Sequence, residues 1–199
     1  MNTGIVLLHI VKKENLIGEQ LAALQKIAEK IEQNSGVKVV AIVKDGTIFK
    51  TINKVVDELN CILVIMGTHG MKGVQKLTGS YALKVIVGSK IPYLVIQQEP
   101  AYHETLNILF PVDFKVETKE KLKWLGFLSR ILQIHVTLFA ITGKDGALDV
   151  PVKANMVFCK KFLEEREISH TIELGEQSST SHEQIMMAAK RVKADMIVI

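Results

Sequence analysis

A glycine-rich stretch after one apolar segment carries the clearest chemical signal in this sequence. The segment Cys61–Met66 predicts a buried strand, and it runs directly into Gly67 and Gly70. Gly79 and Ser80 then open a predicted helix. Consecutive backbone N–H groups beside a helix N-terminus form an anion site, and a serine there can cap the helix and bind phosphate. The stretch therefore predicts a phosphate-binding loop.

Other side chains in the loop can be explained by a structural role as well as by a functional one. Lys72 and Lys76 could add positive charge, but solvated lysines explain them better. His69 has no carboxylate or nucleophile at a motif spacing, which favours hydrogen bonding to phosphate or a role in loop structure over catalysis. The loop has neither a Walker A sequence nor the dinucleotide GxGxxG pattern. We therefore expect no enzymatic activity, no catalytic residue and no protein-built metal site.

Short apolar runs and helical periodicity alternate along the whole chain. Several runs are continuous in Val, Ile and Leu, as in strands buried on both faces of a parallel sheet. The predicted strands are Ile5–Val11, Val37–Val43, Cys61–Met66, Tyr93–Gln97, Leu106–Val112, Val136–Ile141, Thr171–Leu174 and Asp195–Ile199. Amphipathic helices lie between them, and residues 186–189 are expected to be helix core. The predicted apolar faces consist of Leu21, Leu24, Ala28 and Ile31, of Leu122, Leu125, Leu128 and Leu132, and of Met156, Cys159 and Leu163. The first of these helices is expected to end at Gly36. This alternation predicts an α/β fold with right-handed crossovers.

The sequence also repeats itself. Segments 4–67 and 135–199 both follow the order strand, helix, strand, helix, strand. Gly4–Ile10 matches His135–Ile141, and Asn60–Ile65 matches Ala194–Ile199. Two copies of one module explain this pattern, with residues 1–98 as the first domain, residues 105–199 as the second and a linker at 98–105.

The glycine loop and its surroundings resemble the universal stress protein family. Met-Gly-Thr-His-Gly after a strand, followed by Gly-Ser opening a helix, is similar to that family's signature. The turn Val43–Gly46, the strand Lys90–Ile96 and the segment Ile108–Phe114 match further parts of the family pattern. The resemblance covers essentially the whole chain. It implies a doubly wound, mostly parallel five-stranded sheet of strand order 3-2-1-4-5, of the adenine nucleotide alpha hydrolase-like type, in two tandem copies.

The resemblance also implies a nucleotide site for ATP, with Mg²⁺ as a possible companion. In the family, the ends of the loop hold the triphosphate, and an aspartate after the first strand contacts the nucleotide. The positions that match in this sequence are Ile10, Met66, Gly67, His69, Gly70, Gly79, Ser80, Tyr81, Pro111, Asp113 and Ile141. Of these, Ile10 and the last three lie on the adenine side.

Three functions remain open from the sequence. The first is an ATP-binding stress-response or regulatory module with little or no catalysis. The second is an interaction or scaffold protein of the same fold that has lost its nucleotide. The length of the loop supports this alternative, because only eight residues, 71–78, separate Gly70 from Gly79, where the family pattern has about nine. The third, an enzyme of the related hydrolase superfamily, would require a substrate domain or a catalytic carboxylate near the loop.

Against the family order, both copies look incomplete. The first begins at strand two and lacks its first strand and helix, and the second lacks its last helix and strand. Without the central strand, two neighbouring strands would expose unpaired edges inside the sheet, which is costly. The sequence therefore suggests a fragment, or a missing strand that another molecule supplies by swapping.

Composition narrows the partners. The net charge is +4, and acidic and basic residues are interleaved, so we expect no nucleic-acid partner. Two distant cysteines and the lack of a long apolar run predict a cytoplasmic protein without a membrane partner. From the family and the apolar strand Tyr93–Gln97, we expect a homodimer or an intramolecular pseudo-dimer of the two repeats.

Overall fold

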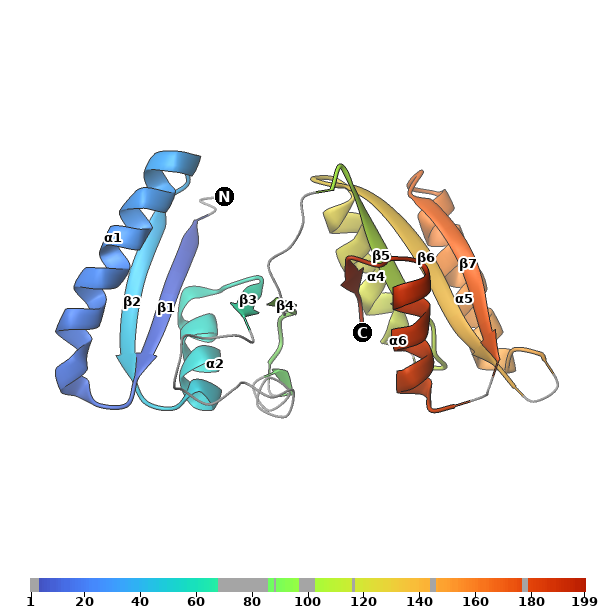
Figure 1. The fold of residues 1–199 in the computed structure, drawn as a ribbon, viewed down its shortest axis with the longest axis horizontal. Helices are drawn as coiled ribbons and strands as arrows, with labels where there is room; N and C mark the ends of the chain where they lie inside the picture. The colour runs from blue at the N-terminus through green and yellow to red at the C-terminus, as the bar shows by residue number, and fades with distance from the viewer. Residues whose placement is uncertain are drawn as a thin grey trace. The chain divides into compact units, whose positions relative to one another are not determined.

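The structure, a computed structural model, describes residues 4–67, 86–87, 89–96, 103–115, 117–143, 146–176 and 179–199 (Figure 1). The chain forms two compact units, Met1–Glu99 and Pro100–Ile199. Among the described helices, none is both long and apolar enough to cross a membrane.

The first unit contains four strands in two separate pairs. Its elements are β1 (Ile5–Val11), the 3-10 turn η1 (Glu14–Leu16), α1 (Ile17–Ser35), β2 (Val39–Asp45), α2 (Ile48–Leu59), β3 (Val64–Gly67) and β4 (Tyr93–Ile96). Strand β1 pairs in parallel with β2, and β3 pairs in parallel with β4. Within the described part of the unit, neither pair is hydrogen-bonded to the other.

Helix α1 follows the predicted pattern. Leu21, Leu24 and Ile31 are half-buried and Ala28 is buried, so the expected apolar face is the face that packs. Gly36 ends the helix with a left-handed φ of 68°, and its N–H donates to the Glu32 carbonyl at 2.8 Å. The predicted C-cap is confirmed, because only glycine adopts this conformation without strain.

The second unit contains a continuous four-stranded parallel sheet. Its elements are β5 (Thr105–Pro111), α4 (Thr118–Leu128), β6 (Gln133–Thr142), α5 (Val150–Glu164), β7 (Ser169–Glu176), α6 (Ser181–Arg191) and β8 (Met196–Ile197). The strand order is β7-β6-β5-β8. Counted within the unit, this is the predicted order 3-2-1-4.

Both faces of this sheet are covered. On one face, Phe110 and Val136 pack with Leu122 of α4 and Leu163 of α5. On the other face, Leu109 of β5 packs with Phe139 and with Ala188 of α6. Strand β5 contributes to both layers, which explains why its residues form a continuous apolar run.

The parallel α/β architecture is confirmed, whereas a five-stranded sheet does not form among the described residues of either unit. Some side-chain placements also differ from the sequence patterns. Helix α4 ends at Leu128, so Leu132 does not continue its apolar face and is 47% exposed. The predicted helix core at residues 186–189 is buried only at Ala188 and Ala189.

Candidate functional site

Strand β3 directly precedes the predicted phosphate loop. Met66 and Gly67 are its last residues and pair with Val95 and Ile96 of β4. Met66 is half-buried and Gly67 is exposed. The other predicted loop residues lie outside the described part of the chain: His69, Gly70, Gly79, Ser80 and Tyr81.

Gly67 is not required by packing in the strand. Its φ is not positive, and among the described residues a Cβ built on it would meet the Ile96 carbonyl oxygen alone, at 4.0 Å. The described neighbours therefore leave room for a methyl group. A glycine at this position leaves the backbone accessible, so that a ligand can approach it closely.

A polar contact holds β4 against the helix that precedes β3. The Tyr93 hydroxyl donates to Oδ1 of Asn53 in α2 at 2.9 Å. Burial raises the pKa of the Tyr93 phenol, so it stays protonated and able to donate this bond. The strand pair β3–β4 is thus tied to α2 beside the start of the loop.

The adenine-side positions are split between the two units. Ile10 is half-buried near the end of β1, opposite Lys44 of β2. Pro111, Asp113 and Ile141 belong to the second unit, where they follow or end β5 and β6. In that unit the carboxyl ends of the two strands meet, because the Val112 N–H donates to the Phe139 carbonyl at 2.7 Å.

Asp113 organises the turn between β5 and α4. Its Oδ1 accepts hydrogen bonds from the Thr118 hydroxyl at 2.8 Å and from the Lys115 N–H at 3.0 Å. The Asn155 side-chain amide of α5 donates to the carbonyl oxygens of Asp113 and Lys115, at 2.8 and 3.1 Å. Both of these hydrogen bonds to the carboxylate fall on Oδ1, and among the described residues none falls on Oδ2.

The carboxylate is the favoured form of Asp113. Partial burial raises its pKa, but hydrogen bonds from Thr118 and from the Lys115 amide, with the charges of Lys121 and Lys115, outweigh burial and lower the pKa below its ordinary value. Pro111 at the end of β5 and Ile141 near the end of β6 are half-buried, so this end of the sheet combines apolar surface with an ionised acceptor. Such a combination can accept a hydrogen bond from an amino or hydroxyl group of a ligand.

Sequence reasoning missed Thr118 and Asn155. Thr118 is fully buried at the start of α4, and Asn155 is a polar residue inside the apolar stretch of α5. The signal that could have identified Asn155 is a polar residue within an apolar helical stretch. Its partners are backbone carbonyls from a turn 40 or more residues away, which no local pattern identifies.

The described residues contain no group of three His, Cys, Asp or Glu side chains that could hold a metal ion.

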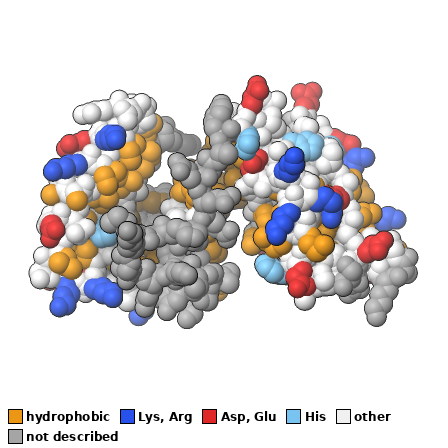
Figure 2. All heavy atoms as spheres, viewed as in Figure 1, with side chains coloured by type: hydrophobic (Ala, Val, Ile, Leu, Met, Phe, Trp, Pro, Cys, Tyr) orange, Lys and Arg blue, Asp and Glu red, His pale blue; other side chains and the backbone are white. Residues whose placement is uncertain are grey.

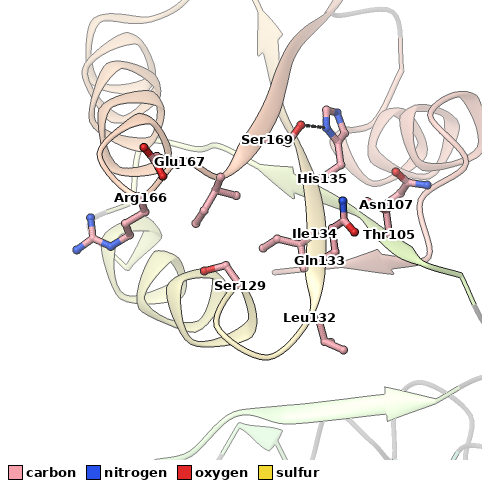
Figure 3. A pocket seen from close by; sticks show the side chains of 11 residues that line it. Thr105, Asn107, Ser129, Leu132, Gln133, Ile134, His135, Arg166, Glu167 and Ser169 are labelled. Atoms are coloured by element: carbon pink, nitrogen blue, oxygen red, sulfur yellow. Dashed lines mark hydrogen bonds between the residues drawn. The ribbon is translucent and has the colours of Figure 1, made fainter.

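A hollow of about 530 Å³ lies at the opposite edge of the second unit's sheet (Figure 3). It is lined by the amino ends of strands, including Thr105, Gln133, His135 and Ser169. His135 Nδ1 lies 2.8 Å from the Ser169 hydroxyl, the contact drawn dashed in Figure 3. Ligands of doubly wound sheets bind at the carboxyl ends of strands, so this hollow is not the candidate nucleotide site.

Comparison with known proteins identifies the first unit. The universal stress protein family model matches residues 6–97, which run from β1 to just past β4. These residues are therefore similar to the universal stress protein family. The candidate loop of residues 66–81 lies inside the matched region.

Solved structures show the same fold across nearly the whole chain. A universal stress protein from Archaeoglobus fulgidus DSM 4304 has a TM-score of 0.70 and 18% sequence identity, and the match covers 94% of this chain and 68% of that one. A functionally unknown protein from Pseudomonas aeruginosa PAO1 has a TM-score of 0.66 and 16% identity, with 97% and 69% covered. A search of curated proteins gives no significant match. The chain thus has the fold of these solved structures.

Proposed function

We propose that this protein is an ATP-binding regulatory module of the universal stress protein kind, with little or no catalysis of its own. The observation that carries the proposal is the position of β3. This strand ends at Gly67, directly before the glycine-rich loop, in the unit that matches the family model. The adenine-side residues and the loop together make ATP, with Mg²⁺ held through its phosphates, the expected ligand.

The phosphate side of the site rests on the open backbone at the end of β3. Gly67 has an ordinary φ, and its described neighbours leave room for a methyl group, so neither of these demands glycine there. Close approach of a ligand to the backbone would explain a glycine at this position. His69, Gly70, Gly79 and Ser80 would continue the same anion site along the loop.

In the first unit the adenine side rests on Ile10, which offers a half-buried apolar side chain near the end of β1. The second unit carries matching positions of its own. There, the hydrogen bonds that Asp113 accepts from described residues fall on Oδ1. An ionised oxygen beside apolar surface suits recognition of a nucleoside by stacking and hydrogen bonding.

Assembly follows from the apolar strand at the end of the first unit. Every residue of β4 is only half-buried within the unit, so this strand has apolar surface left to cover. We propose that a second copy, or the second repeat of a tandem protein, covers it. A dimer or pseudo-dimer would then place two nucleotide-binding modules in one regulatory assembly.

The test is equilibrium binding of ATP to the full chain, with variants that add side-chain bulk at loop glycines. Gly70→Val and Gly79→Val should abolish binding, and Gly67→Ala should weaken it at least tenfold while leaving the thermal unfolding temperature unchanged. Gly18→Ala is the matched control, because a Cβ there meets nothing within 4 Å and lies in α1. Equal affinity of all four variants would overturn the site.

One observation favours the second candidate, an interaction protein without nucleotide. Ile62, just before β3, is 64% exposed, and Ile65, within β3, is 61% exposed. Large exposed apolar residues beside a strand are typical of a surface that another chain covers. Absence of any ATP binding, combined with capture of a protein partner through these residues, would favour this function over the first.

A further inference from the structure

Helices α4 and α5 form a second hollow in the second unit, here called the α4–α5 hollow. Both helices pack on the face of the sheet opposite α6 (Figure 1). The hollow has a volume of about 440 Å³, and no described residue of the candidate nucleotide site lines it. Its lining comes from the second half of each helix and the residues that follow, and includes Lys123, Gly126, Phe127, Arg130, Phe162 and Arg166.

Gly126 sets the depth of the α4–α5 hollow. A Cβ on this residue would lie 3.2 Å from Cζ of Phe162 and 3.7 Å from Nε of Arg166. Because Gly126 has no side chain, the Phe162 ring can lie against the backbone of α4. Phe162 is half-buried and Phe127 is 41% exposed, so aromatic carbon is accessible in the hollow.

The charged side chains that line the hollow, among the described residues, are all basic: Lys123, Arg130 and Arg166. The Arg166 guanidinium lies 3.8 Å from the centre of the Phe162 ring, and its Nη1 donates to the Phe162 carbonyl at 3.3 Å. Its ion pair with Glu165, at 3.8 Å, is exposed on both sides and contributes little. Lys123 and Arg130 have no ion pair with a described carboxylate. The hollow therefore presents positive charge beside aromatic surface.

The opposite face of the second unit has a different charge pattern. Figure 2 shows acidic and basic side chains intermixed on this face, which carries α6. There, Arg191 of α6 pairs with Glu173 of β7. The excess of positive charge in the α4–α5 hollow is thus a local feature and not a property of the whole surface.

We propose that the α4–α5 hollow binds an acidic amphipathic helix of another protein. Large apolar side chains of that helix lie against Phe127 and Phe162, which supply the aromatic contact surface. Its carboxylates pair with Lys123, Arg130 and Arg166, so the charge of the hollow selects an acidic partner.

The spacing of the lining residues fits a helical occupant. Lys123, Phe127 and Arg130 follow one another at intervals of four and three residues, which places them along one stripe of the surface. A helix laid along this stripe repeats its own side chains at the same intervals, so apolar residues flanked by carboxylates meet matching partners. A lipid membrane fits less well, because a planar surface does not enter a recess between two helices.

The probe is a synthetic helical peptide in which Leu or Phe recurs with helical periodicity and Asp and Glu fill the other positions. Its binding to the full chain is followed by the fluorescence of Trp124, the one tryptophan of the sequence, whose ring lies 5.7 Å from that of Phe127. Binding should saturate, and it should weaken as the salt concentration rises. Amide NMR shifts should change in α4 and α5 but not in α6.

Charge reversal at exposed residues tests the electrostatic contacts. The double variant Lys123→Glu with Arg130→Glu should weaken peptide binding by about tenfold or more. Lys153→Glu with Lys190→Glu is the matched control, because it makes the same change in charge at exposed residues that do not line the hollow. At physiological salt it should change the affinity by less than about twofold. Phe127→Ala should weaken binding by about tenfold, and thermal unfolding checks that each variant is folded.

Three results would overturn the proposal: failure of the acidic peptide to bind, equal losses in the two double variants, or equally tight binding of a control peptide with Lys in place of Asp and Glu. Binding of phosphatidylglycerol vesicles without binding of the peptide would also overturn it, and would assign the hollow to a membrane surface instead.

Discussion

The two units build their cores differently although their elements succeed one another in the same order. Among the described residues of the second unit, nine apolar side chains are 0% exposed: Leu109, Phe110, Leu122, Leu125, Val136, Leu138, Cys159, Leu163 and Ala188. Among the described residues of the first unit, the most buried apolar side chain is Val55, at 4%. The comparison teaches that one central strand, shared by two core layers, decides whether a βαβαβ segment becomes a closed core.

The cysteines offer the largest expected contrast between the units. Burial raises the pKa of the Cys159 thiol from 9.0 to about 12, which lowers its thiolate fraction by about a thousandfold. Cys61 is only half-buried. With a disulfide reagent at pH 8, Cys61 should react in the native protein and Cys159 only after unfolding. The Cys61→Ser variant should have no fast thiol, and rapid labelling of that variant would contradict the closed core.

A matched pair of leucines measures the contrast as free energy. Leu138 of β6 is 0% exposed, whereas its repeat counterpart Leu7 of β1 is half-buried. Leu138→Ala should lower the free energy of unfolding of the second unit by about 3 to 5 kcal/mol, because it leaves a cavity. Leu7→Ala should cost the first unit about 1 to 2 kcal/mol. Urea unfolding followed by hydrogen exchange separates the two, and Trp124 fluorescence reports on the second. Equal costs would mean that the first unit has a closed core.

Two strand glycines sharpen the comparison at the level of single contacts. A Cβ on Gly175 of β7 would lie 2.7 Å from the Phe139 ring and 2.9 Å from Gln184 Oε1. Gly175→Ala should therefore destabilise the second unit by about 1 to 3 kcal/mol. Gly67→Ala, with its nearest contact at 4.0 Å, should change the stability of the first unit by less than about 0.5 kcal/mol. Thermal unfolding of both variants checks this, and a stable Gly175→Ala protein would show that Phe139 can move.

The smallest expected effect is a pH dependence confined to the second unit. The folded-state pKa of Asp113 is lowered, so its contribution to stability is present above the ordinary value of about 3.9 and is lost as pH falls through the folded pKa. Between about pH 5 and pH 2, the second unit should lose less stability in Asp113→Asn than in the natural sequence. The first unit should respond identically in both proteins.

A companion variant, Thr118→Val, removes the hydroxyl that stabilises the Asp113 carboxylate but keeps the side-chain volume. It should reduce the same pH dependence, because the pKa of Asp113 then rises toward its ordinary value. An unchanged pH profile in both variants would contradict the assigned cause of the pKa shift.

Local patterns in the sequence predicted the elements well. Strand β1 has the predicted bounds, Gly36 caps α1, and Met156, Cys159 and Leu163 line the buried face of α5. These features were predictable because they depend on the local periodicity of apolar residues and on the backbone preference of glycine. The prediction that Leu132 continues the apolar face of α4 is wrong because the helix ends four residues before it. Met186 is 40% exposed because α6 buries its alanines instead.

The site was predictable only in outline. The sequence placed Met66 and Gly67 at the end of a strand, and Asp113 just after one, as the structure has them. It did not predict the hydrogen bonds of Thr118 and Asn155 around Asp113, because these join elements that are far apart in the chain. Among the described residues of the first unit, the strands form two separate pairs and not the five-stranded sheet that the resemblance implied.

The most direct test of the central claim is a hydrogen-exchange footprint of MgATP on the intact chain. The account predicts slower exchange of the β3 amides, Val64–Gly67, and of the loop that follows them through Tyr81, with little change in β6 and β7. Protection confined to the second unit around Asp113, or no protection at saturating MgATP, would contradict ATP binding on the loop after β3.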